Sequence, residues 1–233
     1  MTGLRRLIHG VLKRLGYRIS RIDVKSIDSI AHNLPDSVNA FYADPQWVQE
    51  YASPARLAFF EQIVDLALEA GVRIDGRRVC DVGCGTGHLL AAVQRRTHLA
   101  TLTGYEQSRA ALDVARRTCP TAVLGEIDLL RDAPTEKFDV VFCTEVLEHL
   151  VEPEVGLRSL AGMIAEGGWL VLTVPNGRKD TFEGHIQFWS PESWQHFLER
   201  DGCGLPRRSG TFGPGEAHLF AILGPNASLP GVP

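Results

Sequence analysis

The chain has 233 residues, of which 44% are apolar and 22% charged, and this length and composition predict one globular domain with a short appendage. No apolar run reaches the ~18 residues that a membrane-spanning helix needs, and five cysteines without a C-x-x-C pair predict reduced thiols and a cytoplasmic setting. The formal net charge of −4 divides into +6 for residues 1–25 and −10 for the rest, which disfavours a nucleic-acid partner for the main domain.

The first 25 residues are predicted to form a basic amphipathic helix. Its basic side chains lie away from an apolar face. That face comprises Leu4, Ile8, Val11, Leu12 and Leu15. Two interpretations stay open for this helix. It packs on its own domain or on a second copy in a homodimer, or it makes peripheral contact with an anionic membrane surface.

Residues 26–74 are predicted to hold a connector and a helical cap. The stretch 26–39 is polar, and we expect Pro35 to break it, with helical structure beginning at Ala40 and ending at Gly71 as a C-cap. Some cap residues are candidates to line a ligand pocket, although packing in an aromatic core is the favoured interpretation for most of them. These candidates are Tyr42, Tyr51 and Arg56.

A glycine-rich turn follows a short apolar strand in the segment V-C-D-V-G-C-G-T-G-H-L-L, residues 79–90. Glycines let a ligand approach the main chain, and a helix begins directly after them. A dinucleotide site needs G-x-G-x-x-G, but His88 stands where its last glycine would be. Asp81 would repel a pyrophosphate and suits a ligand with an ammonium and a sulfonium, so we predict S-adenosylmethionine (SAM) over a dinucleotide. The predicted contacts are Asp81, Gly83, Cys84, Gly85 and Gly87.

Strands and helices alternate after this turn, which predicts a Rossmann-like α/β fold over residues 75–225: a seven-stranded, mostly parallel sheet with helices on both faces. The strand 101–106 ends in Glu106, at a spacing from the glycine turn that lets an acid reach ribose hydroxyls. Residues that follow the strand 138–143 should lie in the ligand crevice, at the carboxyl ends of the strands. Residues 226–233 are predicted to be a flexible tail.

The D-x-G-x-G-x-G motif, the acid at Glu106 and the segments 138–150 and 168–176, in this order, resemble the class I SAM-dependent methyltransferases over residues 75–224. The resemblance implies SAM as the cofactor. The further cofactor contacts that it implies are Gln107, Asp128, Leu129 and Thr144, with Glu126 as a competitor of Asp128 beside the adenine.

The run E-V-L-E-H-L at residues 145–150 and H-x-x-F-x-x-P-E at residues 185–192 resemble two branches of this family. One branch holds the ubiquinone-biosynthesis type of O-methyltransferase and its relatives that act on sugars and secondary metabolites. The other holds small-RNA 2′-O-methyltransferases. If residues 145–150 are helical, their two glutamates and the histidine share one face. The metal ligands implied by the resemblance are Glu145, Glu148, His149 and His185. Two carboxylates with one or two imidazoles favour Mg²⁺ or Mn²⁺, and Fe²⁺ and Zn²⁺ stay open as alternatives.

These motifs predict a SAM-dependent O-methyltransferase whose acceptor is a hydroxylated small molecule, first a sugar or glycan precursor and next a phenolic or quinone head group. The catalytic residues that we expect are Glu145 and His149, the latter as general base or as metal ligand. RNA 2′-O-methylation is an alternative that the acidic main domain disfavours. A catalytically silent SAM-binding scaffold protein is the non-enzyme alternative.

Overall fold

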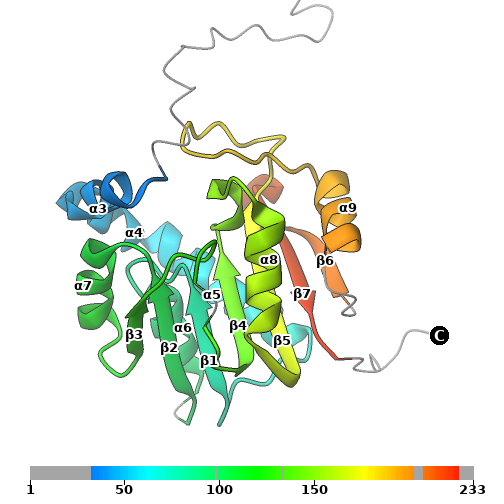
Figure 1. Ribbon diagram of the computed structural model, residues 1–233, viewed down its shortest axis with the longest axis horizontal. Coiled ribbons are helices and arrows are strands. Elements are labelled where there is room, and N and C mark those ends of the chain that lie inside the picture. The colour runs from blue at the N-terminus through cyan, green and yellow to red at the C-terminus, as the bar shows by residue number, and fades with distance from the viewer. Residues whose placement is uncertain (1–32, 98, 133, 202–206, 226–233) are drawn as a thin grey trace, which may run out of the picture.

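The computed structural model describes residues 33–225 except 98, 133 and 202–206 (Figure 1). The predicted amphipathic helix within residues 1–25 and the predicted tail at 226–233 lie outside the described residues. Within the part of the chain that the structure describes, no helix combines the length and apolar character needed to cross a membrane.

A seven-stranded sheet organises the chain, with the strand order β3-β2-β1-β4-β5-β7-β6. The strands from β3 to β5 are all parallel, and β7 runs antiparallel to both β5 and β6. This arrangement confirms the predicted Rossmann-like sheet. The strands are β1 Arg78–Val82, β2 Thr101–Glu106, β3 Val123–Glu126, β4 Phe138–Thr144, β5 Ile164–Pro175, β6 Arg207–Phe212 and β7 His218–Leu223.

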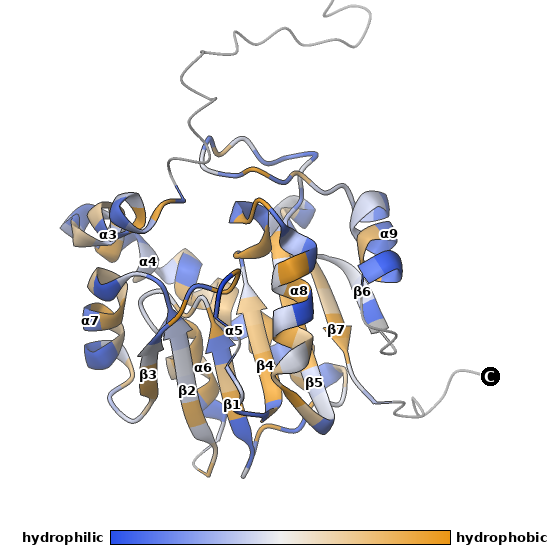
Figure 2. Cartoon of the chain, in the orientation of Figure 1, coloured by the Kyte–Doolittle hydropathy of each residue, from blue (hydrophilic) through white to orange (hydrophobic). Residues whose placement is uncertain are grey.

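Helices cover both faces of the sheet, as predicted, and each face has its own apolar core. Ile63 of α5 and Leu90 of α6 are fully buried on one face, and Leu157 of α8 and Trp194 of α9 are buried on the other. Strands such as β4 and β7 are hydrophobic along most of their length (Figure 2). The helices are α3 Pro35–Ala43, α4 Pro45–Tyr51, α5 Pro54–Glu69, α6 His88–Arg96, α7 Arg109–Thr118, α8 Pro153–Gly162 and α9 Pro191–Asp201, with the 3₁₀ turns η2 Leu147–His149 and η3 Pro214–Glu216.

The cap consists of α3, α4 and α5, and each of these helices begins with a proline. Pro35 is the first residue of α3, so the expectation that it breaks a connector, with helix beginning only at Ala40, was wrong. The physical reason is that proline fits the first helical position, where its missing N–H would have no partner. Gly71 follows the end of α5 with a φ of +90°, and its N–H donates to the Leu68 carbonyl (2.9 Å), as the predicted C-cap requires.

Two segments lie over the carboxyl ends of the parallel strands, at the top of Figure 1: the α3–α4 pair and the loop 176–190 between β5 and α9. Asn33, just before α3, donates its side-chain amide to the Gly184 carbonyl of that loop (2.9 Å). Crevices at this edge of an open α/β sheet are where such folds bind ligands. The fold therefore brings the cap and this loop to the edge of the sheet at which the predicted site residues lie.

We expect Ile63→Ala to lower the free energy of unfolding by about 2–5 kcal/mol, because truncation of this fully buried side chain leaves a cavity between α5 and the sheet. Leu68 lies on the same helix but is 37% exposed, so Leu68→Ala should cost less than about 1 kcal/mol. Urea unfolding followed by circular dichroism measures both values. Equal losses would contradict the buried face that we assign to α5.

Candidate functional site

The glycine turn joins β1 to α6 and has the backbone that its sequence predicts. Gly83, Gly85 and Gly87 all have positive φ, at +76°, +49° and +79°. A side chain at Gly83 would collide with Val146, because its Cβ would lie 2.3 Å from Val146 Cγ2. At Gly85 a Cβ would lie 3.2 Å from the Tyr42 hydroxyl. Glycine is therefore required by conformation and by the close approach of neighbouring segments.

Glu106 at the end of β2 is tied directly to the glycine turn. Its carboxylate accepts hydrogen bonds from the backbone N–H of Gly85 (3.0 Å) and of Ser108 (2.9 Å), and the side chain is buried. Burial raises the pKa of Glu106, while the N–H groups of Ser108 and Gly85 oppose that rise. Each carboxylate oxygen has a further lone pair, so Glu106 keeps the capacity to accept from a ligand hydroxyl.

Asp81 on β1 is a buried acid with an unsatisfied atom. It is 1% exposed, and its Oδ1 has no hydrogen-bond partner among the described residues. Burial raises the pKa of Asp81 to about 8, and the negative charge of Glu106 adds to the rise. A cationic ligand beside Asp81 would stabilise its carboxylate, whereas a pyrophosphate would destabilise it further. The environment of Asp81 thus supports the predicted preference for a positively charged ligand.

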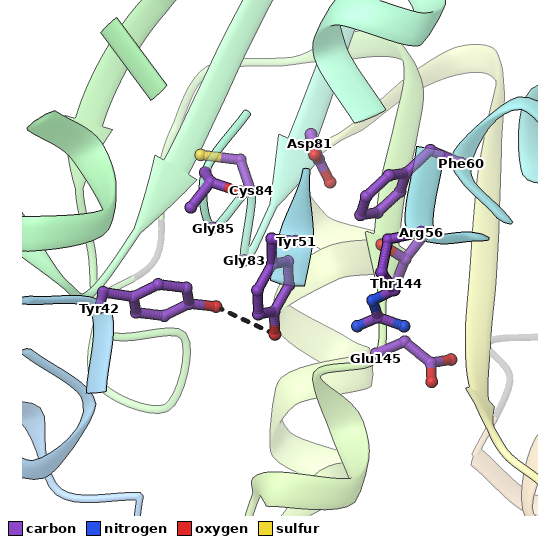
Figure 3. Close-up of a pocket in the computed structure, with 11 residues that line it drawn as sticks. Tyr42, Tyr51, Arg56, Phe60, Asp81, Gly83, Cys84, Gly85, Thr144 and Glu145 are labelled. Atoms are coloured by element: carbon purple, nitrogen blue, oxygen red, sulfur yellow. Dashed lines mark hydrogen bonds between the residues drawn. The ribbon is translucent and has the colours of Figure 1, made fainter. Parts of the chain in front are cut away.

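A pocket lies between the glycine turn and the cap helices (Figure 3). Its cavity volume is about 40 Å³, and the pocket is partly open to solvent. The predicted pocket candidates from the cap all line it, rather than only filling a core. The lining residues are Tyr42, Tyr51, Arg56, Phe60, Asp81, Gly83, Cys84, Gly85, Thr86, Thr144 and Glu145.

Arg56 brings a positive charge into the pocket. Its guanidinium carbon lies 5.0 Å from the centroid of the Tyr51 ring and 5.1 Å from that of Phe59, so two aromatic faces hold it in place. Arg56 and Asp81 line the same pocket with opposite charges, which suits a ligand that carries both a carboxylate and an ammonium. The sequence offered a signal for Arg56, because it is a charged residue within an otherwise apolar stretch of α5.

Asn39 attaches the cap beside the site, a role that no motif in the sequence predicts. The Asn39 Oδ1 accepts from the Ser108 hydroxyl (2.9 Å) and from the Ala110 N–H (3.2 Å) at the start of α7. Ser108 is also the residue whose N–H donates to Glu106. The cap, the first turn of α7 and the acid at the end of β2 therefore form one connected set of hydrogen bonds.

Glu145 does not begin a helix, so the condition under which the two glutamates and His149 would share one helical face is not met. Its φ is +55°, and the 3₁₀ turn η2 covers only Leu147–His149. The Glu145 N–H donates to the Thr173 carbonyl of β5 (2.9 Å), which extends the β4–β5 pairing past the end of β4. The carboxylate accepts from the Thr173 hydroxyl (2.9 Å) and lies 3.1 Å from His218 Nδ1. Glu145 thus faces the pocket and is held by β5 and β7.

The other three predicted metal ligands do come together. One ligand atom from each of Glu148, His149 and His185 lies within 4.8 Å of the others. Glu148 Oε1 is 4.0 Å from His149 Nε2 and 3.8 Å from His185 Nε2. Glu145 stands outside this group, since its carboxylate contacts Thr173 and His218, and its role as a metal ligand stays a prediction.

Glu148 is the electrostatic centre of this group. It is 0% exposed, and neither carboxylate oxygen has a hydrogen-bond partner among the described residues. Burial and the nearby charge of Glu145 raise the pKa of Glu148, while burial and His185 lower the pKa of His149 to about 4. A divalent cation would satisfy the orphaned oxygens. One carboxylate with two imidazoles fits Mn²⁺, Fe²⁺ or Zn²⁺ better than Mg²⁺, which prefers oxygen ligands.

The remaining predicted cofactor contacts lie along the same edge of the sheet. Thr144 ends β4 and is buried, and Gln107 follows Glu106. In the loop after β3, Leu129 is buried, and the Asp128 Oδ1 accepts from the Leu130 N–H (3.0 Å). The competitor of Asp128, Glu126, instead forms an exposed ion pair with Arg109 (2.7 Å).

Comparison with known proteins gives a consistent result. The family model described as "Methyltransferase domain" matches residues 49–205. A ubiquinone biosynthesis O-methyltransferase of Coxiella burnetii is 33% identical over 131 residues, which are 53% of this chain and 51% of that protein. The chain thus spans about half the length of this curated relative.

Two solved structures show the likeness in fold. The N-methyltransferase NodS of Bradyrhizobium japonicum, in complex with S-adenosylhomocysteine, matches with a TM-score of 0.66 at 20% sequence identity. The match covers 84% of this chain and 100% of the NodS chain. The magnesium protoporphyrin IX methyltransferase of Synechocystis, with S-adenosylhomocysteine bound, has a TM-score of 0.61 at 20% identity over 88% of this chain and 100% of its own. The chain therefore belongs to the methyltransferase-domain family, and its fold is that of the class I SAM-dependent methyltransferases, as the sequence motifs predict.

Proposed function

We propose that this chain binds SAM over the glycine turn and transfers its methyl group to a hydroxyl of a small-molecule acceptor. Asp81 faces the cationic part of the cofactor, Arg56 receives its carboxylate, and Glu106 accepts from the ribose hydroxyls. The observation that carries the proposal is the short segment after β4. Within it, Thr144 and Glu145 line the cofactor pocket, and the Glu148–His149 pair follows directly.

Methyl transfer from a sulfonium is an in-line displacement. The acceptor oxygen forms a bond to the methyl carbon, the carbon–sulfur bond breaks, and S-adenosylhomocysteine leaves with the electron pair. The protein has to orient the acceptor and remove the hydroxyl proton. Histidine with an ordinary pKa of about 6.5 is a weak base for a phenol of pKa about 10, with a mismatch worth about 5 kcal/mol. Burial lowers the pKa of His149 further, so histidine alone is poorly suited to this task.

Glu148, His149 and His185 fit a divalent cation, which when bound supplies positive charge that lowers the pKa of an acceptor hydroxyl. His149 is neutral near pH 7 because its pKa is about 4, and a neutral imidazole is the form that ligates metals. Glu145 precedes this group in the sequence and lines the cofactor pocket. Its side chain is held by contacts with Thr173 and His218. Its role in this proposal is to line the acceptor side of the cofactor.

Aromatic side chains beside His185 favour a phenolic acceptor over the sugar that the sequence motifs put first. The rings of Phe182 and Phe188 lie 4.8 Å and 6.4 Å from that of His185, measured between centroids. Both are about half exposed, at 48% and 52%, so they present apolar surface to an incoming molecule. An aromatic diol offers a matching face and hydroxyls of lower pKa. The likeness to a ubiquinone biosynthesis O-methyltransferase supports the same class.

Asp81→Asn should weaken S-adenosylhomocysteine binding by at least ~10-fold, because it removes the charge that faces the cofactor ammonium. The same change should stabilise the ligand-free protein. A carboxyl with a folded-state pKa of about 8, raised above its unfolded value of 3.8, destabilises the fold increasingly as pH rises between these values. The gain in melting temperature should therefore be larger at pH 8 than at pH 5. Calorimetric titration and thermal unfolding at both pH values measure these effects.

Asp139→Asn is the matched control on the neighbouring strand β4. Arg78 lowers the pKa of Asp139, so its ion pair stabilises the protein above pH ~4, and the substitution should lower the melting temperature at pH 8 more than at acid pH. Its S-adenosylhomocysteine affinity should stay unchanged. An Asp81→Asn variant that binds like wild type would remove the ammonium site from the proposal.

Glu148→Ala and His149→Ala should each lower kcat/KM for methyl transfer by at least ~100-fold, while S-adenosylhomocysteine affinity stays near the wild-type value. The assay presents a panel of catechols, single phenols and sugar diols, with EDTA and with added Mn²⁺. We expect the catechols to be methylated fastest and EDTA to suppress the reaction. His196 is an exposed histidine on α9, and His196→Ala should leave every rate unchanged. Full turnover by both site variants would refute the assignment, and faster methylation of sugars would restore the sugar acceptor.

A further inference from the structure

We infer that Asp180 is a positioning residue that fixes the His185 ring with its Nε2 facing Glu148. This inference rests on the proposed metal-assisted function. Asp180 lies in the loop after β5, and its side chain is 9% exposed. Its Oδ2 lies 2.5 Å from His185 Nδ1, and its Oδ1 accepts from the Phe182 N–H (3.0 Å). Both carboxylate oxygens are engaged, so Asp180 is held in one orientation.

The partners of the two rings determine where their protons lie. A carboxylate accepts hydrogen bonds, so the contact with Asp180 places a proton on His185 Nδ1. His149 Nδ1 lies 3.2 Å from the Gly184 carbonyl oxygen, which also only accepts. In a neutral imidazole with a proton on Nδ1, the Nε2 carries the free lone pair. Both Nε2 atoms are also the ones closest to Glu148, at 3.8 Å and 4.0 Å.

A simple buried ion pair does not explain this geometry. A doubly protonated His185 would donate from Nε2 to Glu148, but 3.8 Å is too long for a hydrogen bond, and both Glu148 oxygens have no such partner. Two lone pairs and one carboxylate therefore converge on the same space without bonding to one another. This is the arrangement in which a carboxylate behind a histidine orients it toward a metal ion.

Backbone contacts keep the loop in register with the Glu148 turn. The N–H groups of Ile186 and Gln187 both donate to the Glu148 carbonyl, at 2.8 Å and 3.0 Å. The Gln187 side-chain amide donates to the Leu150 carbonyl (3.1 Å). These bonds place His185 next to Glu148, but they leave rotation of the imidazole ring free. We assign the orientation of the ring to its contact with Asp180.

NMR spectra of nitrogen-labelled imidazole rings in the metal-free protein test the inference without activity. In the wild type we expect a proton on His185 Nδ1, donated to Asp180. In Asp180→Ala the ring should become a mixture of both tautomers, and Mn²⁺ affinity measured by calorimetry should fall ~10- to 100-fold. S-adenosylhomocysteine affinity should stay unchanged, which verifies folding of the variant. Glu183→Ala is the matched control, since it removes an exposed acid three residues along the same loop and should change none of these values.

The outcomes separate this inference from the proposed function. A wild-type His185 without a proton on Nδ1 would overturn the positioning role, as would an unchanged tautomer in Asp180→Ala. Equal loss of Mn²⁺ affinity in Asp180→Ala and Glu183→Ala would show that the affinity depends only on the negative charge of the loop. That result would also overturn the positioning role. If the wild type binds no Mn²⁺, the metal in the proposed function fails, and the tautomer spectra still decide the role of Asp180.

Discussion

The fold removes three acidic side chains from water at the carboxyl edge of its sheet: Asp81, Glu106 and Glu148 are 1%, 7% and 0% exposed. Burial raises the pKa of each of them, which means that their charged forms are disfavoured where they stand. Only Glu106 has backbone N–H donors on its carboxylate, and both other residues keep oxygens without partners. A sheet with a complete apolar core on each face offsets this cost.

Asp81 and Glu148 suit different ligands, and the residues around each acid determine which ligand it suits. Asp81 shares its pocket with Arg56 and the cap tyrosines, so an acidic and a basic side chain line the same pocket. Glu148 has two imidazoles as its nearest polar neighbours, which supply lone pairs and no positive charge while they stay neutral. The first environment suits a zwitterionic organic cofactor and the second a metal ion. One edge of the sheet thereby presents two environments of different chemistry within a short stretch of chain.

The sequence predicted those features that depend on neighbours along the chain. Glycine spacing identified the turn, and the acid at the end of β2 proved to bond to that turn. Residue order predicted the sheet and both helical layers. Features set by distant contacts could not be foreseen. The Glu145 N–H donates to the Thr173 carbonyl, and no helix begins there. Asn39 on α3 accepts from Ser108 at the start of α7, 69 residues further along the chain. The contact between Asp180 and His185 likewise depends on a loop conformation that no local sequence pattern predicts.

The backbone conformation of Glu145 lets one continuous segment line the cofactor pocket and also carry Glu148 and His149. A residue other than glycine rarely adopts positive φ, and holding it there costs about 1–3 kcal/mol. Here the strain is balanced by the bonds of its N–H and carboxylate to Thr173 and by the contact with His218. A regular helix from this point would have put Glu145 and Glu148 on one face, with two carboxylates in one place. With the left-handed turn, the Glu145 carboxylate instead contacts Thr173 and His218 at the cofactor pocket, while Glu148 lies beside the two histidines. This one backbone angle therefore keeps Glu145 outside the group of Glu148, His149 and His185.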